Sequence, residues 1–159
     1  MDHVLALLKE NARISLEDAA RQLNLSTDEV AAAIDQLEKK GIIRAYTAIV
    51  NEDKTGGNSV TAVIEVNVQP EREGGFDRIA SRLAFHPEVT SMYLMSGQYD
   101  LMLFVEGSDL RTVASFVSEK LSSIPGVTGT ATHFRLKTYK HHGVLMERQH
   151  ETERLQVSP

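Results

Sequence analysis

The chain has 159 residues, of which 42% are hydrophobic and 25% are charged, and its formal net charge at pH 7 is -5. This length suits one medium or two small globular domains, and the absence of cysteine excludes disulfides, thiolate metal sites and cysteine nucleophiles. No apolar run approaches the roughly 20 residues that span a bilayer, and the N-terminus lacks the basic region of a secretory signal, so we expect a cytoplasmic protein without membrane contacts.

Both halves of the chain are acidic. Residues 1–57 hold 7 Lys/Arg and 10 Asp/Glu, and residues 58–159 hold 10 and 12. Because most non-specific affinity for DNA comes from Lys and Arg side chains that release counterions, this balance argues against tight DNA binding by a monomer.

Three helices are expected before residue 41. Apolar residues recur at helical spacing over 4–8, 16–23 and 30–37. Ser15 followed by Asp18, and Ser26 followed by Glu29, place a hydroxyl cap and a carboxylate at the starts of the second and third helices. The close spacing of these two starts predicts a helix-turn-helix, whose second helix would enter the major groove of DNA.

A change of composition follows this helical unit. The branched residues of 42–50 predict a strand that leaves it, and the polar run 51–57, which ends in two glycines, predicts a hinge between domains. The tail 141–159 is mostly polar, with two short apolar runs, 144–146 and 155–157, either of which would suit a short strand or arm.

From residue 58 the pattern is strand, helix, strand, strand, helix, strand. The strands are expected at 60–68, 89–95, 99–106 and 127–139, and the helices at 76–84 and from 108 or 109 to 124. This order is typical of an α+β, ferredoxin-like βαββαβ domain, a four-stranded antiparallel sheet with both helices on one face. The inward residues expected on the second of these helices are Leu110, Val113, Ala114, Phe116, Val117, Leu121 and Ile124.

Such a sheet has one face that its helices leave uncovered. An apolar face on a soluble chain usually pairs with another copy, so we expect at least a dimer. The residues expected on this face are Val63, Tyr93, Met95, Leu103 and Phe134.

Signatures of catalysis and of metal or nucleotide binding are absent. None of the six histidines forms an i, i+4 pair with glutamate, and the neighbours His141 and His142 suit a solvated turn better than a metal site. The glycine pairs lack the spacing of phosphate-binding loops. Asp100 is the only acid in a plausible pocket and has no nucleophile motif beside it, so we expect no enzyme, no metal and no cofactor.

The loop from Ser96 to Asp100 offers groups that an amino acid needs. Gly97 lets the backbone approach a ligand, neighbouring N–H groups suit a carboxylate, and Asp100 suits an ammonium. The alternative is a tight hairpin whose aspartate caps its own backbone, which the residues alone favour. Thr130 and Thr132 point to one side of their strand and would either add hydroxyls to a site at a subunit interface or be solvated.

Taken together, these residues resemble the Lrp/AsnC, or leucine-responsive/feast-famine, family of transcription regulators from residue 2 to about residue 140. In the first domain the resemblance rests on Asp2-His-Val-Leu-Ala-Leu-Leu, on Asn11-Ala-Arg-Ile-Ser, on Leu-Asn-Leu-Ser at 23–26 and above all on the run from 37 to 51. In the second it rests on Pro87-Glu-Val, Ser96-Gly-Gln-Tyr-Asp-Leu, Pro125-Gly-Val, and Thr132 with Leu136 and Lys137.

The resemblance implies a winged helix-turn-helix DNA-binding domain at 1–50, a linker at 51–57, a ferredoxin-like effector-binding and oligomerisation domain at 58–140 and a C-terminal tail at 141–159. Its implied partners are double-stranded DNA, an amino-acid effector in place of a cofactor, and further copies of the chain, as dimers that assemble into tetramers or octamers. In the family the amino acid binds between subunits near the loop that corresponds here to Met95, Ser96, Gly97, Gln98, Tyr99 and Asp100, beside which Thr130 and Thr132 are the further candidates.

The implied DNA-reading surface departs from the family, whose members often present arginines there. The base-reading set is Thr27, Asp28, Ala31, Ala32, Asp35, Gln36 and Lys39, and phosphate contacts would fall to Arg13, Arg21, Lys39, Lys40 and Arg44. Aspartates repel phosphates, although an aspartate can accept from cytosine and several weak heads on one DNA multiply affinity. Two hypotheses remain open: an amino-acid-responsive DNA-binding regulator, and an amino-acid-sensing oligomer with weak or lost DNA binding.

Overall fold

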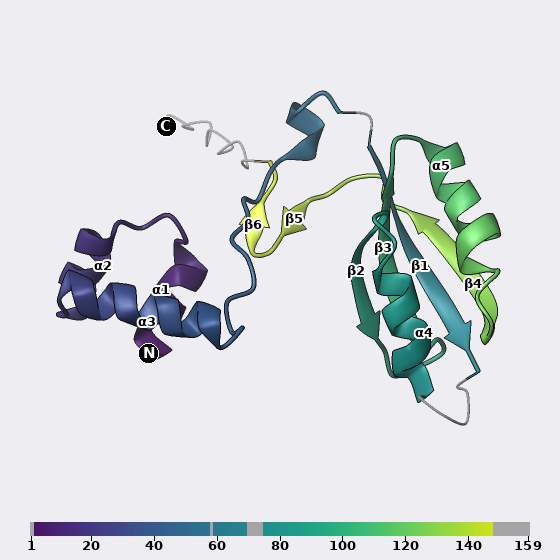
Figure 1. Ribbon diagram of the computed structural model, residues 1–159. Helices are drawn as coiled ribbons and strands as arrows, with labels where there is room; N and C mark the ends of the chain where they lie inside the picture. Colours follow the sequence, from purple (N-terminus) through teal and green to yellow (C-terminus); the bar gives the residue numbers. More distant parts are fainter. Residues whose placement is uncertain (1, 58, 70–74, 148–159) are drawn as a thin grey trace, which may run out of the picture. The chain divides into compact units, whose positions relative to one another are not determined.

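The computed structural model describes residues 2–57, 59–69 and 75–147 (Figure 1). The chain divides into two compact units, Met1–Ile49 and Val50–Pro159. The first contains only helices, and the second contains an antiparallel sheet with two helices.

The helical unit is the predicted helix-turn-helix. It consists of α1 (Asp2–Glu10), α2 (Leu16–Leu23) and α3 (Thr27–Lys39). The Ser15 hydroxyl accepts from the Asp18 N–H at 3.0 Å, as predicted for the start of α2. Buried side chains from all three helices form the small core of this unit: Val4, Ala19, Ala20, Val30 and Leu37.

A complete capping box fixes the start of α3. The Glu29 N–H donates to the Ser26 hydroxyl at 3.2 Å, and the Ser26 N–H donates to Glu29 Oε2 at 2.7 Å. The Ser26 N–H, and then the Ser26 hydroxyl, which donates to the same Oε2 at 2.8 Å, lower the pKa of the Glu29 carboxyl below its ordinary value. The turn before α3 passes through Asn24, whose left-handed φ of 53° suits asparagine.

The strand expected at 42–50 does not form. Residues 44–50 are mostly exposed, and no backbone hydrogen bond joins them to any other residue in the described part of the chain. A strand needs a neighbouring strand to satisfy its N–H and C=O groups, and none of the strands in the described residues pairs with this segment. A branched sequence is therefore not sufficient for a strand here.

The run 51–57 lies against the sheet unit. It contains a 3₁₀ turn, Glu52–Lys54, and the Asn51 side-chain amide donates to the Met146 carbonyl at 2.7 Å. Glu52 Oε2 accepts from Arg135 Nη2, also at 2.7 Å.

The second unit has the predicted βαββαβ order. Its elements are β1 (Val60–Val68), α4 (Gly75–Ala84), β2 (Val89–Leu94), β3 (Leu101–Gly107), α5 (Leu110–Ser115) and β4 (Val127–Phe134). The strands pair antiparallel in the order β2-β3-β1-β4. A π-helical turn, Phe116–Leu121, continues α5, and a two-stranded hairpin, β5 (Lys140–His141) with β6 (Val144–Leu145), follows β4.

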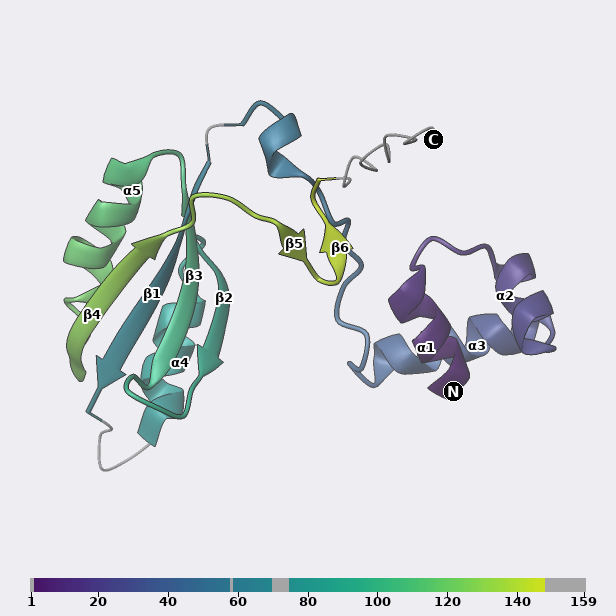
Figure 2. The same ribbon diagram turned by 180° about the vertical axis from the view of Figure 1, so that it is seen from behind.

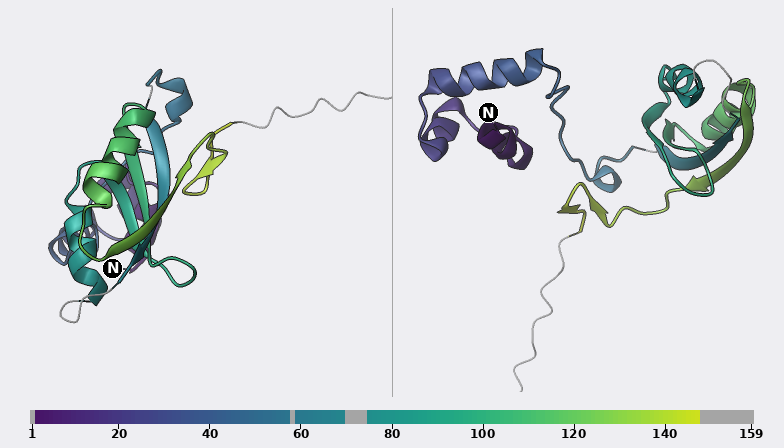
Figure 3. Two further views of the ribbon diagram at one scale, coloured as in Figure 1. Left: turned by 90° about the vertical axis from the view of Figure 1, so that its right-hand side faces the viewer. Right: turned by 90° about the horizontal axis from the view of Figure 1, so that it is seen from below.

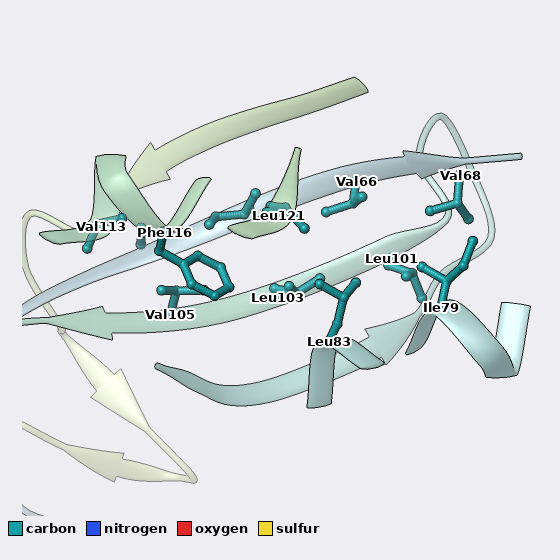
Figure 4. Close-up of a cluster of buried hydrophobic side chains, with 12 residues drawn as sticks. Val66, Val68, Ile79, Leu83, Leu101, Leu103, Val105, Val113, Phe116 and Leu121 are labelled. Atoms are coloured by element: carbon teal, nitrogen blue, oxygen red, sulfur yellow. The ribbon is translucent and has the colours of Figure 1, made fainter. Parts of the chain in front are cut away.

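The core lies between the sheet and its two helices. Alternate residues of β1 and β3 meet α4 and α5 on one side, as the labelled side chains in Figure 4 show. Both helices lie on this side, so the view from behind in Figure 2 has the strands in front of α4, and Figure 3 shows the same layering edge-on. The residues buried there include Ala62, Ile64, Val66, Leu101, Leu103, Val105, Ile79, Leu83, Val113, Phe116 and Leu121.

Three of the five residues expected on the uncovered face are not there. Leu103 pairs with Ile64 and is completely buried in the core. Phe134 pairs with Ala62 and so lies on the helix-covered side, and Met95 lies beyond the end of β2. Leu101 to Val105 is apolar at every position, so the sequence does not show which of these side chains face the helices. Val63 and Tyr93 do lie on the uncovered face, together with Met102 and Phe104.

Two expected core residues of α5 are exposed. Leu110 sits in the first turn with 57% of its surface accessible. Ala114 is also exposed, because it follows Val113 directly and is turned about 100° from it around the helix. The π-helical turn changes the spacing of the buried face, so that Leu121, five residues after Phe116, returns to the core.

Leu103, which is buried against expectation, and Leu110, which is exposed against expectation, give a matched test of the core. Leu103→Ala should lower the free energy of unfolding by about 2–5 kcal/mol, because it leaves a cavity between the sheet and the helices. Leu110→Ala, the same change at an exposed position, should stay within about 0.5 kcal/mol of the parent. Chemical denaturation followed by circular dichroism measures both, and equal losses from the two substitutions would contradict the register described above.

Candidate DNA-binding surface and effector loop

The predicted base-reading residues share the outer face of α3. Six of the seven are exposed and Ala31 is half-buried, whereas Val30 and Leu37 on the opposite face are buried. The capping box holds the N-terminal end of this face, where Thr27 and Asp28 lie. The face is therefore available for contact along its whole length, and its exposed members are Thr27, Asp28, Ala32, Asp35, Gln36 and Lys39.

Acidic side chains dominate the electrostatics of this face. Its single cation, Lys39, forms an ion pair with Asp35 one turn earlier, with Nζ and Oδ2 2.8 Å apart. The hydrogen bond to Asp35, and then the charge of that carboxylate, raise the pKa of Lys39 above its ordinary value. Asp28 is exposed and has no ion-pair or hydrogen-bond partner among the described residues. It is also near the helix N-terminus, where the helix dipole favours a carboxylate.

The predicted phosphate contacts divide into paired and unpaired cations. Arg21 pairs with Asp18 on its own helix at 2.9 Å, as Lys39 does with Asp35. Both pairs are largely exposed, so they contribute little to stability and can be exchanged for a phosphate at small cost. Within the described residues, Arg13, Lys40 and Arg44 are exposed and have no acidic partner.

The predicted effector loop connects β2 to β3. Ser96, Gly97 and Gln98 are exposed, and Met95, Tyr99 and Asp100 are half-buried. Gly97 adopts a φ of 145°, which side chains rarely adopt, and no atom approaches the position of an added Cβ within 4 Å. The tip of the loop is thus open to an incoming molecule.

Asp100 has a structural role at the base of this loop. Its N–H donates to the Val66 carbonyl at 3.1 Å, and its Oδ2 accepts from the Val68 N–H at 2.8 Å. The Met95 N–H donates to the Asp100 carbonyl at 2.8 Å and closes the loop. The aspartate therefore caps a backbone group of β1 rather than of its own loop. Oδ1 makes no hydrogen bond within the described part of the chain.

Thr130 and Thr132 do not meet the loop within one chain. They pair with Val66 and Ile64, so both are on the helix-covered side of the edge strand β4 and are half-buried. β1 lies between them and the loop, a separation of two strand spacings, or about 9–10 Å. A site that uses both groups would need them from different subunits.

A cavity of about 160 Å³ within the second unit is not foreseen in the sequence. It lies between residues 50–57, the segment that follows β4 and the β5–β6 hairpin. Glu52 and Arg135, which both line it and are hydrogen-bonded to each other, are 83 residues apart in the chain. The only sequence signal is an acidic pair, Glu52 and Asp53, in the linker and a basic pair, Arg135 and Lys137, after β4.

Neither a metal-binding cluster nor a membrane-spanning helix is found among the described residues. No group of three or more His, Cys, Asp or Glu side chains is placed to hold a metal ion there. His141 and His142 stack edge to face with ring centroids 4.3 Å apart. In residues 2–57, 59–69 and 75–147, no helix has the length and apolar character that crossing a membrane requires.

Comparison with known proteins adds independent information. Residues 3–44 match a family model described as winged helix-turn-helix DNA-binding, and residues 61–145 match one described as the Lrp/AsnC ligand binding domain. An uncharacterised HTH-type transcriptional regulator of Bacillus subtilis, YugG, is 44% identical over 157 residues, which cover 98% of this chain and 95% of that protein. The proline dehydrogenase transcriptional activator of Rhodobacter capsulatus is 31% identical over 84% of this chain and 86% of its own length.

A solved structure agrees with these sequence matches. The transcriptional regulator NMB0573 of Neisseria meningitidis, solved in complex with L-Met, superposes with a TM-score of 0.70. It is 27% identical, and the match covers 87% of this chain and 89% of that one.

The structural role of Asp100 can be separated from its charge. Asp100→Ala removes the acceptor for the Val68 N–H and should lower the free energy of unfolding by about 1–3 kcal/mol. Asp100→Asn keeps a side-chain oxygen at that position and should stay within about 0.5 kcal/mol of the parent. Thermal and chemical denaturation measure both variants, and an alanine variant as stable as the asparagine variant would show that the hydrogen bond to Val68 contributes nothing.

Proposed function

Because the chain belongs to the Lrp/AsnC family of transcription regulators, with a DNA-binding helix-turn-helix and a ligand-binding domain, we propose that it is a homo-oligomer whose DNA binding responds to an amino acid. The observation that carries this proposal is the pairing of two parts in one chain. The first is a capped α3 with an exposed outer face, and the second is a ligand-binding domain with an open loop at Gly97. An effector that binds one oligomeric arrangement better than another shifts the population towards it, and so changes the spacing of the DNA-reading helices.

The loop supplies the groups for the proposed effector. The exposed residues Ser96, Gly97 and Gln98 present backbone N–H groups for a carboxylate, and Asp100 Oδ1 is available for an ammonium. The bound L-Met in the Neisseria relative supports an amino acid as the class of effector here. In the proposed site, Thr130 and Thr132 come from a neighbouring subunit.

The uncovered sheet face supports self-association. Tyr93 and Phe104 meet edge to face there, with ring centroids 6.1 Å apart, and Val63 and Met102 adjoin them. We assign this face to a second copy of the chain. Several helix-turn-helix units on one DNA molecule would then compensate for the weak cationic character of each.

The outer face of α3 favours a second candidate function. Asp28 and Asp35 repel phosphates, and Lys39 is engaged by Asp35. An amino-acid-sensing oligomer with weak or lost DNA binding would have such a surface. The DNA-binding assignment is preferred because Arg13, Lys40 and Arg44 remain unpaired in the described structure, and because aspartate can accept from the cytosine N4 amino group.

The function is tested by electrophoretic mobility shift with a duplex from the chain's own upstream region, at low salt, with and without each of the twenty amino acids. The regulator should shift this duplex more strongly than an unrelated one, and one or a few amino acids should change the apparent affinity at least fivefold. In Asp100→Asn the shift should persist and the amino-acid response should weaken. No shift with any amino acid, together with amino-acid binding in calorimetry, would instead support the sensing oligomer.

A charge substitution on α3 tests whether this face meets the phosphates. Asp35→Asn removes a negative charge and releases Lys39, so non-specific DNA affinity at low salt should rise roughly threefold. Asp77→Asn, the same charge change at an exposed position on α4, is the matched control and should leave affinity unchanged. Fluorescence anisotropy with a labelled duplex measures both, and equal effects would assign the gain to net charge rather than to α3.

A further inference from the structure

The 160 Å³ cavity of the second unit is separate from both proposed sites. Its wall is formed by residues 50–53, 57 and 59, by Thr61 at the start of β1, by residues 135–138, and by His141 and Met146. None of the residues of α3 or of the loop 95–100 lines it. All of its lining residues belong to the second unit.

Arg135 provides a fixed cation on this wall. Its Nη2 donates to Glu52 Oε2 and to the Thr61 hydroxyl, each at 2.7 Å, and its side chain is only 33% exposed. The two bonds hold the guanidinium plane in place. They leave Nε and Nη1 without a partner among the described residues. Each of these free N–H groups can donate one hydrogen bond to a carboxylate, and the positive charge of the guanidinium strengthens that bond.

Asp53 provides an uncommitted acid on the same wall. It has no hydrogen bond or ion pair within the described structure, whereas the neighbouring Glu52 is bound to Arg135. Lys137 is likewise engaged, because its Nζ lies 2.8 Å from Glu147 Oε1. The hydroxyl residues Ser59 and Thr138 complete the polar lining. The cavity thus has one cation with spare donors and one carboxylate without a hydrogen bond, whose charge also acts on Lys137.

We propose that this cavity is a second ligand site, for a small zwitterion such as glycine, alanine or serine. The ligand carboxylate binds Arg135 and its ammonium binds Asp53. A cavity volume of about 160 Å³ is similar to the roughly 150 Å³ of a protein cavity that binds benzene, so it suits a molecule of about five to seven non-hydrogen atoms. The inference does not require the loop 95–100 to bind an effector.

Methionine-methyl NMR on the full-length chain can observe the two sites separately. Met146 lines the cavity and Met95 belongs to the effector loop, so each has its own reporter. Titration with glycine, L-alanine and L-serine should move the Met146 signal saturably for at least one of them. Acetate and methylamine, which carry only one of the two charges, should each bind at least tenfold more weakly.

Two variants assign the contacts. Asp53→Asn should weaken the Met146 response at least tenfold, because it removes the charged partner of the ammonium and keeps the shape of the side chain. Asp100→Asn should leave the Met146 response unchanged, which separates this site from the loop. An unmoved Met146 signal with all three amino acids would overturn the proposal, whatever Met95 shows. A response of Met146 that Asp53→Asn leaves intact, or that acetate reproduces at equal affinity, would overturn it as well.

Discussion

The two-residue alternation of β1 and β3 against a single layer of helices is the constraint on which the ligand-binding unit depends. Ile64 and Leu103 pair across the two strands and are completely buried, in one core with Leu83 of α4 and Phe116 of the π-helical turn that continues α5. A slip of one residue in this register would expose the core set and bury Met102, Phe104 and Glu65 in its place. The same register therefore determines which face of the sheet is left for another subunit.

This register also positions the loop. Leu101 pairs with Val66, so the residue before it, Asp100, reaches the last amides of β1 and accepts from the Val68 N–H. Oδ2 of Asp100 stabilises the fold through this hydrogen bond, and Oδ1 has no hydrogen-bond partner among the described residues. A side chain that is held by the sheet while it retains an unused oxygen is well prepared for a ligand, because little of its freedom remains to be lost on binding.

The parts of the structure that could be predicted from the sequence are those that neighbouring residues signal. The helix starts at Ser15 and Ser26 are signalled by residues three apart, and the order of strands and helices follows from periodicity, so the helix-turn-helix and the βαββαβ fold were both predictable. Leu103 was assigned to the wrong face because its strand is apolar at every position. The strand at 42–50 was wrong because strand pairing needs a partner that sequence propensity does not supply.

The features that the sequence does not predict depend on contacts that no motif signals. The Arg135–Glu52 pair joins segments 83 residues apart, and neither residue belongs to a recognisable motif. Similarly, the sequence indicates that Asp28 and Asp35 face outward, but only the structure shows that Lys39 is already engaged by Asp35. The residues proposed to bind DNA and effector thus rest on position and chemistry, while the family itself rests on motifs that are local and readable.

The central claim is that the outer face of α3 enters the DNA groove. Because the chain contains no cysteine, a single introduced cysteine can be labelled selectively to test this directly. A single Ala32→Cys substitution at the exposed centre of that face can carry a photo-crosslinker, with Ala114→Cys on α5 as the matched exposed control. On irradiation with the upstream duplex, the label at position 32 should crosslink to bases and the label at 114 should not. Equal crosslinking from both positions, or none from position 32 under conditions where the duplex is bound, would contradict the account.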